Sequence, residues 1–141
     1  MASKGQRTGM RAVFQVAAEL VARGFIVSPT SRSAFGADLL VTNDSCSRAF
    51  SVQVKANSRP ANFWLVGEKA KQLASPTHIY VLVNFDEGEG KHGYYIVPSK
   101  VVKRRMGSSR SQKGSVWHFL SKEDAEEYRN AWKTFGRISK G

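Results

Sequence analysis

Residues 36–41 read Gly-Ala-Asp-Leu-Leu-Val, and residues 50–55 read Phe-Ser-Val-Gln-Val-Lys. As two strands joined by a short polar turn, these stretches predict a hairpin. Side chains alternate between the two faces of a strand, so Gln53 and Lys55 share one face while the valines beside them point to the other. Asp38 begins the first strand, which would bring an acid, an amide and an amine together at one end of the hairpin. Such groups are costly to bury without partners, so their convergence indicates a functional site.

The pattern resembles that of the PD-(D/E)xK nuclease superfamily, which includes restriction-type endonucleases and Holliday-junction resolvases. That pattern is an acid at the start of one strand and an acid-x-Lys on the next, after a helix that ends in a Gly-aromatic pair. Asp38 matches the first acid, Lys55 matches the lysine, and Gly24-Phe25 match the pair. Gln53 stands where Asp or Glu is usual. The resemblance extends to the strand expected at residues 94–97.

The resemblance implies a restriction-endonuclease-like α/β sandwich, in which helices flank a central mixed sheet. The hydrophobic pattern favours the same class, with a helix over residues 8–23 and neighbouring apolar strands at 78–85 and 94–97. The length fits one domain, which we place at residues 8–141. Residues 1–7 are basic and polar, and we expect them to be flexible.

The last third of the chain carries weaker signals. Residues 106–114 are rich in Ser, Gly and basic side chains, which predicts a mobile loop. Residues 115–120 alternate as a strand, with Trp117 toward the core and His118 outward. A serine followed by acids then predicts a capped helix over residues 122–132.

The resemblance also implies the chemistry. Phosphodiester hydrolysis needs a divalent cation that polarises the phosphate, and Mg²⁺ or Mn²⁺ is the expected cofactor. Asp38 would supply a carboxylate, Gln53 a neutral amide oxygen and Val54 its backbone carbonyl, which are ligands of the type that hard cations prefer. Lys55 would orient the attacking water or stabilise the developing charge. Because Gln53 lacks a negative charge, it should bind the cation more weakly than an acid would.

The first helix departs from the family pattern as well. Many relatives carry a metal-binding Glu about three turns before the Gly-aromatic pair, and that place falls near Val13, which cannot ligate a metal. Gln15 and Glu19 are the nearest polar side chains. We assign Glu19 to the metal or to its surroundings. The alternative is that Glu19 lies on a solvated helix face.

The charge of the chain favours a polyanionic partner. It has 22 Lys and Arg against 11 Asp and Glu, a net charge of +11, and DNA is the expected partner. The alternative is a surface that is basic for solubility. Lys4, Arg7 and Arg11 form one basic cluster, and Trp64 is a candidate for stacking on a base. The predicted phosphate-binding residues are Arg59, Lys100, Lys103, Arg104, Arg105, Arg110 and Lys113.

Two other functions remain open on the sequence. The chain could be a nuclease-fold binding module that has lost its metal chemistry, because Gln53 and Val13 replace expected acids. It could also be an accessory protein of a larger assembly, whose basic surface contacts RNA or an acidic protein and which should expose a large apolar patch. A nuclease should instead cluster Asp38, Gln53 and Lys55.

The composition also predicts the cellular compartment of the protein. No apolar run approaches the roughly 20 residues that a membrane-spanning helix needs, and the N-terminus lacks the apolar region of a secretory signal. Cys46 is the single cysteine and cannot form an internal disulfide. We therefore expect a cytoplasmic protein without a membrane partner. The resemblance implies a homodimer as one possible assembly, since many relatives dimerise to cut two strands.

Overall fold

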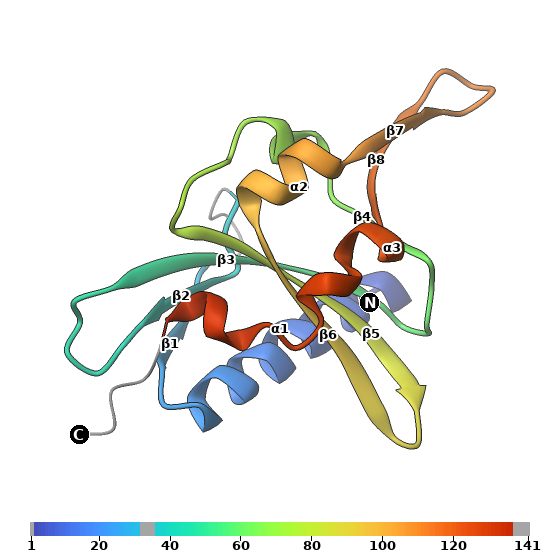
Figure 1. Cartoon of the computed structure of the whole chain (residues 1–141). Coiled ribbons are helices and arrows are strands. Elements are labelled where there is room, and N and C mark those ends of the chain that lie inside the picture. The colour runs from blue at the N-terminus through green and yellow to red at the C-terminus, as the bar shows by residue number, and fades with distance from the viewer. Residues whose placement is uncertain (1, 32–35, 137–141) are drawn as a thin grey trace.

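The central sheet contains the predicted hairpin and organises the rest of the molecule (Figure 1). The computed structural model describes residues 2–31 and 36–136. The strands of this sheet are β1 (Ile26–Pro29), β2 (Leu39–Thr42), β3 (Ala49–Asn57), β5 (His78–Gly88) and β6 (Lys91–Pro98). They lie in the order β1-β2-β3-β5-β6, with β3 parallel to β5 and the other neighbours antiparallel. The mixed sheet and the α/β class that the sequence predicted are therefore confirmed.

Helix α1 (Lys4–Ala22) begins earlier than the pattern predicted. The Ser3 hydroxyl accepts a hydrogen bond from the Gln6 backbone at 3.1 Å, and Gln6 Oε1 accepts one from the Ser3 backbone at 2.9 Å. This capping box satisfies two backbone donors that would otherwise lack partners. Residues 4–7, expected in a flexible terminus, therefore form the first turn of the helix. Within the described ranges, no helix is both long and apolar enough to cross a membrane.

A first core lies between α1 and the central sheet. Buried side chains recur at helical spacing along α1 and meet alternate residues of β3 and β5. Because even-numbered residues of β3 fill this core, Gln53 and Lys55 lie on the other face of the strand, as the alternation predicted. The core includes Ala12, Val16 and Leu20 of α1, Val52 and Val54 of β3, and Ile79 and Val81 of β5.

A second layer covers the other face of the sheet (Figure 1). It consists of helix α2 (Ser99–Arg105), the short helix η1 (Glu68–Lys71) and a sheet in the order β4 (Phe63–Leu65), β8 (Val116–Ser121), β7 (Gly107–Arg110). Trp64 joins the layers, since its indole nitrogen donates to the Val83 carbonyl at 3.0 Å and its ring lies 5.0 Å from that of Tyr95. Trp64 is only 1% exposed. The prediction that its ring stacks on a base is therefore wrong.

Strands β7 and β8 overturn two further predictions. Residues 107–110 form a strand where a mobile loop was expected. A side chain at Gly107 would crowd the Phe119 ring, with its Cβ 2.8 Å from Phe119 Cζ, so a glycine here permits the close pairing of β7 and β8. The faces of β8 are also reversed, because Leu120 pairs with the buried Trp64 and His118 shares its face. His118 is 8% exposed and Trp117 is 53% exposed.

The C-terminal segment begins as predicted and then breaks. Ser121 caps α3 (Lys122–Ala125), its hydroxyl accepting from the Asp124 backbone. The predicted helix to residue 132 is replaced by two short turns, η2 (Glu126–Tyr128) and η3 (Trp132–Phe135). Asn130 between them has a φ of 53°, and its backbone nitrogen donates to Tyr94 of β6 at 2.8 Å. Pairing with the edge of the central sheet thus overrides the local helical signal.

An ionic cluster fastens this segment to β5 and β6. Glu87 accepts a hydrogen bond from the Tyr95 hydroxyl at 2.7 Å and forms ion pairs with Arg129 at 2.8 Å and Lys122 at 3.4 Å. Burial acts to raise the pKa of Glu87, but hydrogen bonds from Tyr95 and Asn84 and the two cationic charges outweigh it and lower the pKa below its ordinary value. The cluster therefore keeps Glu87 ionised where the second layer meets the sheet.

Candidate active site

Asp38 lies directly before β2 and binds β3 through its side chain. The last residue pair between β2 and β3 is Leu39 with Val52, and the Asp38 backbone nitrogen donates to the Val52 carbonyl at 2.7 Å. Beyond the Leu39–Val52 pair, the Asp38 carboxylate takes the place of β2 backbone and bonds to β3. Asp38 Oδ2 accepts hydrogen bonds from Gln53 Nε2 at 2.9 Å and from the Val54 backbone nitrogen at 2.8 Å. Two donors therefore fix one oxygen of the carboxylate.

Lys55 lies on β3, directly after Val54. Its side chain shares the face of Gln53 and is partly buried, and it lines the same cavity as Asp38 and Gln53. Within residues 2–31 and 36–136, no hydrogen bond or ion pair engages the Lys55 amine, which leaves its charge available to an anion. The structure thus brings together the three side chains that the sequence predicted to converge.

The oxygen atoms of this site suit a hard cation. Asp38 Oδ1 accepts no hydrogen bond from the described residues. The Gln53 side chain uses its amide nitrogen to donate to Asp38, so its amide oxygen remains available to a cation. The Val54 carbonyl points to the same edge of β3 as the Val54 nitrogen, where β2 has already ended. One carboxylate and two neutral oxygens are the kinds of ligand that Mg²⁺ accepts, with water completing the shell. No group of three or more His, Cys, Asp or Glu residues that could hold a metal occurs in the described part of the chain.

Helix α1 forms the other wall of the cavity without an acid. Met10 and Val13 line it, one turn apart, together with Gln6 of the first turn. Glu19 lies elsewhere, with its carboxylate paired to Arg23. Six residues of helix rotate a side chain by about 240°, so Glu19 and Val13 face different directions. The structure therefore does not place Glu19 with the other predicted catalytic residues.

A basic groove continues from the cavity. Lys4 and Thr8 of α1 line it on one side, and Arg59 in the loop after β3 lines it on the other. Gly5 and Ala56 belong to both the groove and the cavity, so the two adjoin. The sequence singled out Lys4 and Arg59 separately, because they lie 55 positions apart, and only the packing of α1 against β3 brings them to one groove.

The other predicted phosphate-binding residues divide into two kinds. Lys100, Lys103 and Arg104 are exposed, and their spacing puts them near one side of α2. Arg105 is instead engaged by the protein, since it pairs with Glu127 and donates to the Asp124 carbonyl at 2.8 Å. Its predicted role in phosphate binding is at odds with these contacts. Arg110 and Lys113 are exposed on the β7–β8 hairpin.

Comparison with known proteins supports the fold. No family model and no curated protein sequence matches the chain. Among solved structures, it is similar to a bacterial homing endonuclease, I-Ssp6803I, with a TM-score of 0.57 and 18% identity over 94% of this chain and 90% of that one. It is also similar to Hjc, a Holliday junction resolvase of the hyperthermophilic archaeon Archaeoglobus fulgidus, with a TM-score of 0.53 and 14% identity over 83% of this chain and 89% of that one. The chain therefore has the restriction-endonuclease-like fold of these two nucleases, as its sequence predicted.

Proposed function

We propose that this protein is a metal-dependent nuclease that binds DNA and hydrolyses a phosphodiester bond in the cavity lined by Asp38, Gln53 and Lys55. The observation that carries the proposal is the pair of hydrogen bonds that β3 donates to Asp38 Oδ2, next to an amine without a partner among the described residues. The similarity to a homing endonuclease and a Holliday junction resolvase supports it.

Each residue has a distinct part in the proposed reaction. Asp38 Oδ1, the Gln53 amide oxygen and the Val54 carbonyl would hold Mg²⁺ or Mn²⁺, which supplies Lewis-acid polarisation of the phosphate when bound. The hydrogen bond from Gln53 to Oδ2 orients the Asp38 carboxylate. Lys55 stabilises the negative charge that develops on the phosphate oxygens and helps to place the attacking water.

The DNA backbone would follow the basic groove. Lys4 and Arg59 line its two walls, next to the cavity, and would contact phosphates on one side of the scissile bond. Such contacts release counterions, so affinity should fall steeply with salt and depend little on sequence. These residues position the strand and leave the chemistry to the cavity.

Plasmid cleavage by the wild-type protein tests the proposed function. At low salt the protein should nick a supercoiled plasmid in Mg²⁺ or Mn²⁺ and should not nick it in EDTA. The reason is that Asp38 and its neighbours would act by holding a cation, and the cation polarises the phosphate and activates the water. Gel electrophoresis of the plasmid reads the nicked form, and a binding assay on the same samples reads affinity. Tight, salt-sensitive binding without nicking in either metal would refute the nuclease and favour the binding module.

Substituting Gln53 tests its assignment to the metal. Gln53→Glu places a second carboxylate beside Asp38, so the Mg²⁺ concentration for half-maximal cleavage should fall about tenfold. Without metal the two carboxylates repel each other and the hydrogen bond to Oδ2 is lost, so we expect a loss of about 1–3 kcal/mol in unfolding free energy. Cleavage rates over a Mg²⁺ titration and thermal unfolding with and without Mg²⁺ measure both effects. Gln53→Ala tests the opposite change, because it removes the amide oxygen and should raise the Mg²⁺ concentration that cleavage requires. An unchanged Mg²⁺ requirement in both variants would show that Gln53 is not a metal ligand.

A further inference from the structure

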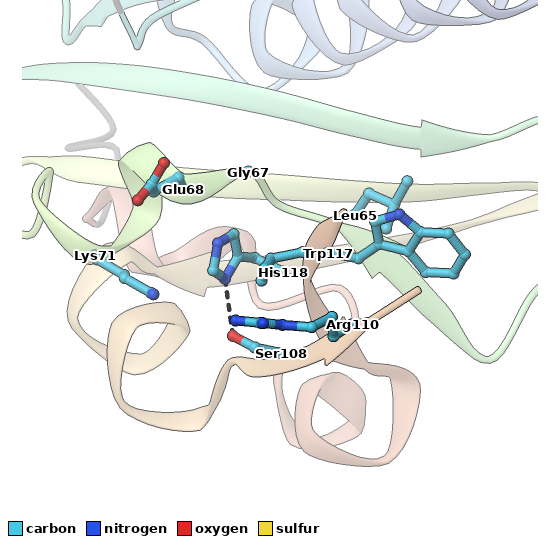
Figure 2. Close-up of a pocket in the computed structure, with 9 residues that line it drawn as sticks. Leu65, Gly67, Glu68, Lys71, Ser108, Arg110, Trp117 and His118 are labelled. Carbon is cyan, nitrogen blue, oxygen red and sulfur yellow. Dashed lines mark hydrogen bonds between the residues drawn. The ribbon is translucent and has the colours of Figure 1, made fainter. Parts of the chain in front are cut away.

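A second cavity lies between η1 and the β7–β8 hairpin (Figure 2). Its volume is about 760 Å³, which is within the range of sites that hold small molecules. Lys71 of η1, Arg110 of β7 and His118 of β8 all line it. The proposed cleavage uses none of these three side chains.

The register of the hairpin puts its polar side chains on one face. Ser108 pairs directly with His118, and Arg110 lies two positions after Ser108 on β7, so all three share that face. This is the face on which η1 lies, and Figure 2 shows Lys71 extending from η1 into the same cavity. Trp117 points to the other face of the hairpin and takes no part in the site.

The imidazole of His118 presents a donor to this cavity. His118 is only 8% exposed, and its Nδ1 lies 2.8 Å from the Ser108 hydroxyl. When that hydroxyl donates to Nδ1, the proton of the neutral imidazole lies on Nε2, and a protonated imidazole carries a proton there as well. Nε2 has no hydrogen-bond partner in the part of the chain that the structure describes. A buried side chain thus has one unused donor at the cavity wall.

The charges around the cavity favour an anion. Lys71 and Arg110 form no ion pair or hydrogen bond with the described residues, so both charges are available. Glu68 is the single acid among the described residues of the lining, and it does not pair with either cation. A guanidinium group and an amine are the groups with which proteins most often bind phosphate. The cavity is larger than a bare anion requires, so a phosphate with its attached sugars fits.

This cavity and the proposed active site lie on the same side of the central sheet. Gln53 and Lys55 point to the face that the second core covers, because their partners on β5, Tyr80 and Leu82, belong to that core. The segment 66–70 packs its buried side chains into the same core and lines the second cavity with two of its exposed residues. One nucleic-acid molecule can therefore reach both sites.

We infer that Lys71, Arg110 and His118 together bind one phosphate group of the nucleic-acid backbone, away from the scissile bond. This inference deepens the proposed function and rests on it for the identity of the ligand. The two cations contact the phosphate oxygens, and His118 Nε2 donates a hydrogen bond to them. Ser108 holds the imidazole in the orientation that this bond needs. Such a contact positions the substrate without reading its sequence.

A double-mutant cycle on DNA binding tests whether the two cations share a phosphate. The probe is a 20-bp duplex without terminal phosphates, and the measurement is made in EDTA so that no cleavage occurs. Lys71→Ala and Arg110→Ala should each weaken binding about fivefold, and the double variant should be less than about tenfold weaker than wild type, because either loss disrupts the same contact. Lys113→Ala is the matched control, since Lys113 is exposed on the same hairpin outside the cavity. Its effect should multiply with that of Arg110→Ala.

NMR of the histidine rings tests the pocket without DNA. Titration with inorganic phosphate should shift the ring resonances of His118, which are identified by their loss in His118→Gln. The resonances of His78, which bonds to Ser51 outside the cavity, should stay in place. Arg110→Ala should abolish the His118 shift, and Lys113→Ala should preserve it.

Two results would overturn the inference. One is a double variant whose loss equals the product of the two single losses, which would make Lys71 and Arg110 independent surface charges. The other is a phosphate titration that leaves the His118 resonances unchanged. Asp38→Asn keeps the two proposals apart, because it should retain both the coupling and the phosphate shift. A protein that fails to cleave can therefore still pass or fail these tests.

Discussion

Asp38→Asn should abolish metal-dependent cleavage, and Lys55→Ala should lower its rate about 10²–10³-fold at saturating Mg²⁺. Asp38 supplies the single carboxylate among the described residues that line the cavity, so a neutral amide in its place removes the negative charge that would attract the cation. Lys55 lines the cavity and has no partner among the described residues, so its loss should leave the fold intact and remove the charge that would face a bound phosphate. Single-turnover nicking of a supercoiled plasmid measures both rates.

Matched variants separate the chemistry from general loss of positive charge. Lys100→Ala removes an exposed lysine of α2 and should reduce affinity at moderate salt with no effect on the rate at saturating protein. Circular dichroism should show that all three variants fold. If Lys55→Ala and Lys100→Ala had the same small effect, Lys55 would be one more phosphate contact and the proposed cleavage site would be wrong.

Trp64→Ala should lower the free energy of unfolding by about 3–5 kcal/mol, the usual cost of removing a large aromatic side chain from a core. Trp64 is 1% exposed, its ring packs on Tyr95, and it provides a hydrogen bond to the Val83 carbonyl of β5. Its removal leaves a cavity and a buried carbonyl without this donor where the second layer meets the central sheet. Urea unfolding at neutral pH measures the effect, which is a large share of the stability of a domain this size.

Two other tryptophan variants calibrate that loss. Trp64→Phe keeps most of the packing and gives up the hydrogen bond, so its cost should be clearly smaller. Trp117→Ala removes an exposed ring and should change the unfolding free energy by about 0.5 kcal/mol or less. Equal destabilisation by Trp64→Ala and Trp117→Ala would contradict the assignment of one ring to the core and the other to the exposed surface.

The sequence predicted the hairpin and the convergence of Asp38, Gln53 and Lys55 because local rules determine both. Strand alternation alone separates Gln53 and Lys55 from Val52 and Val54, and a turn of a few residues leaves one antiparallel register for β2 and β3. That register places Asp38 beside Gln53, as the structure shows. The helix before Gly24 and the apolar strands at β5 and β6 were likewise readable from periodicity.

The elements that the sequence did not predict depend on tertiary contacts. A stretch with alternating Trp117, His118 and Phe119 offers apolar rings on one face, so the pattern favoured burying them, but pairing with β4 sends the opposite face to the core. The helix predicted near the C-terminus does not form beyond α3, because the backbone at Asn130 bonds to β6 instead. The groove that joins Lys4 to Arg59 has no sequence signal, because it forms only when α1 packs on the sheet.

The most direct test of the central claim is to locate the metal. Crystals of the protein in a Mn²⁺ concentration that supports cleavage should give an anomalous diffraction peak within about 2.5 Å of Asp38 Oδ1 and the Gln53 amide oxygen. Asp38→Asn crystals under the same conditions should lose that peak. A wild-type protein that cleaves DNA with Mn²⁺ and shows its peak away from Asp38, or shows none, would contradict the assignment of the cavity as the catalytic site.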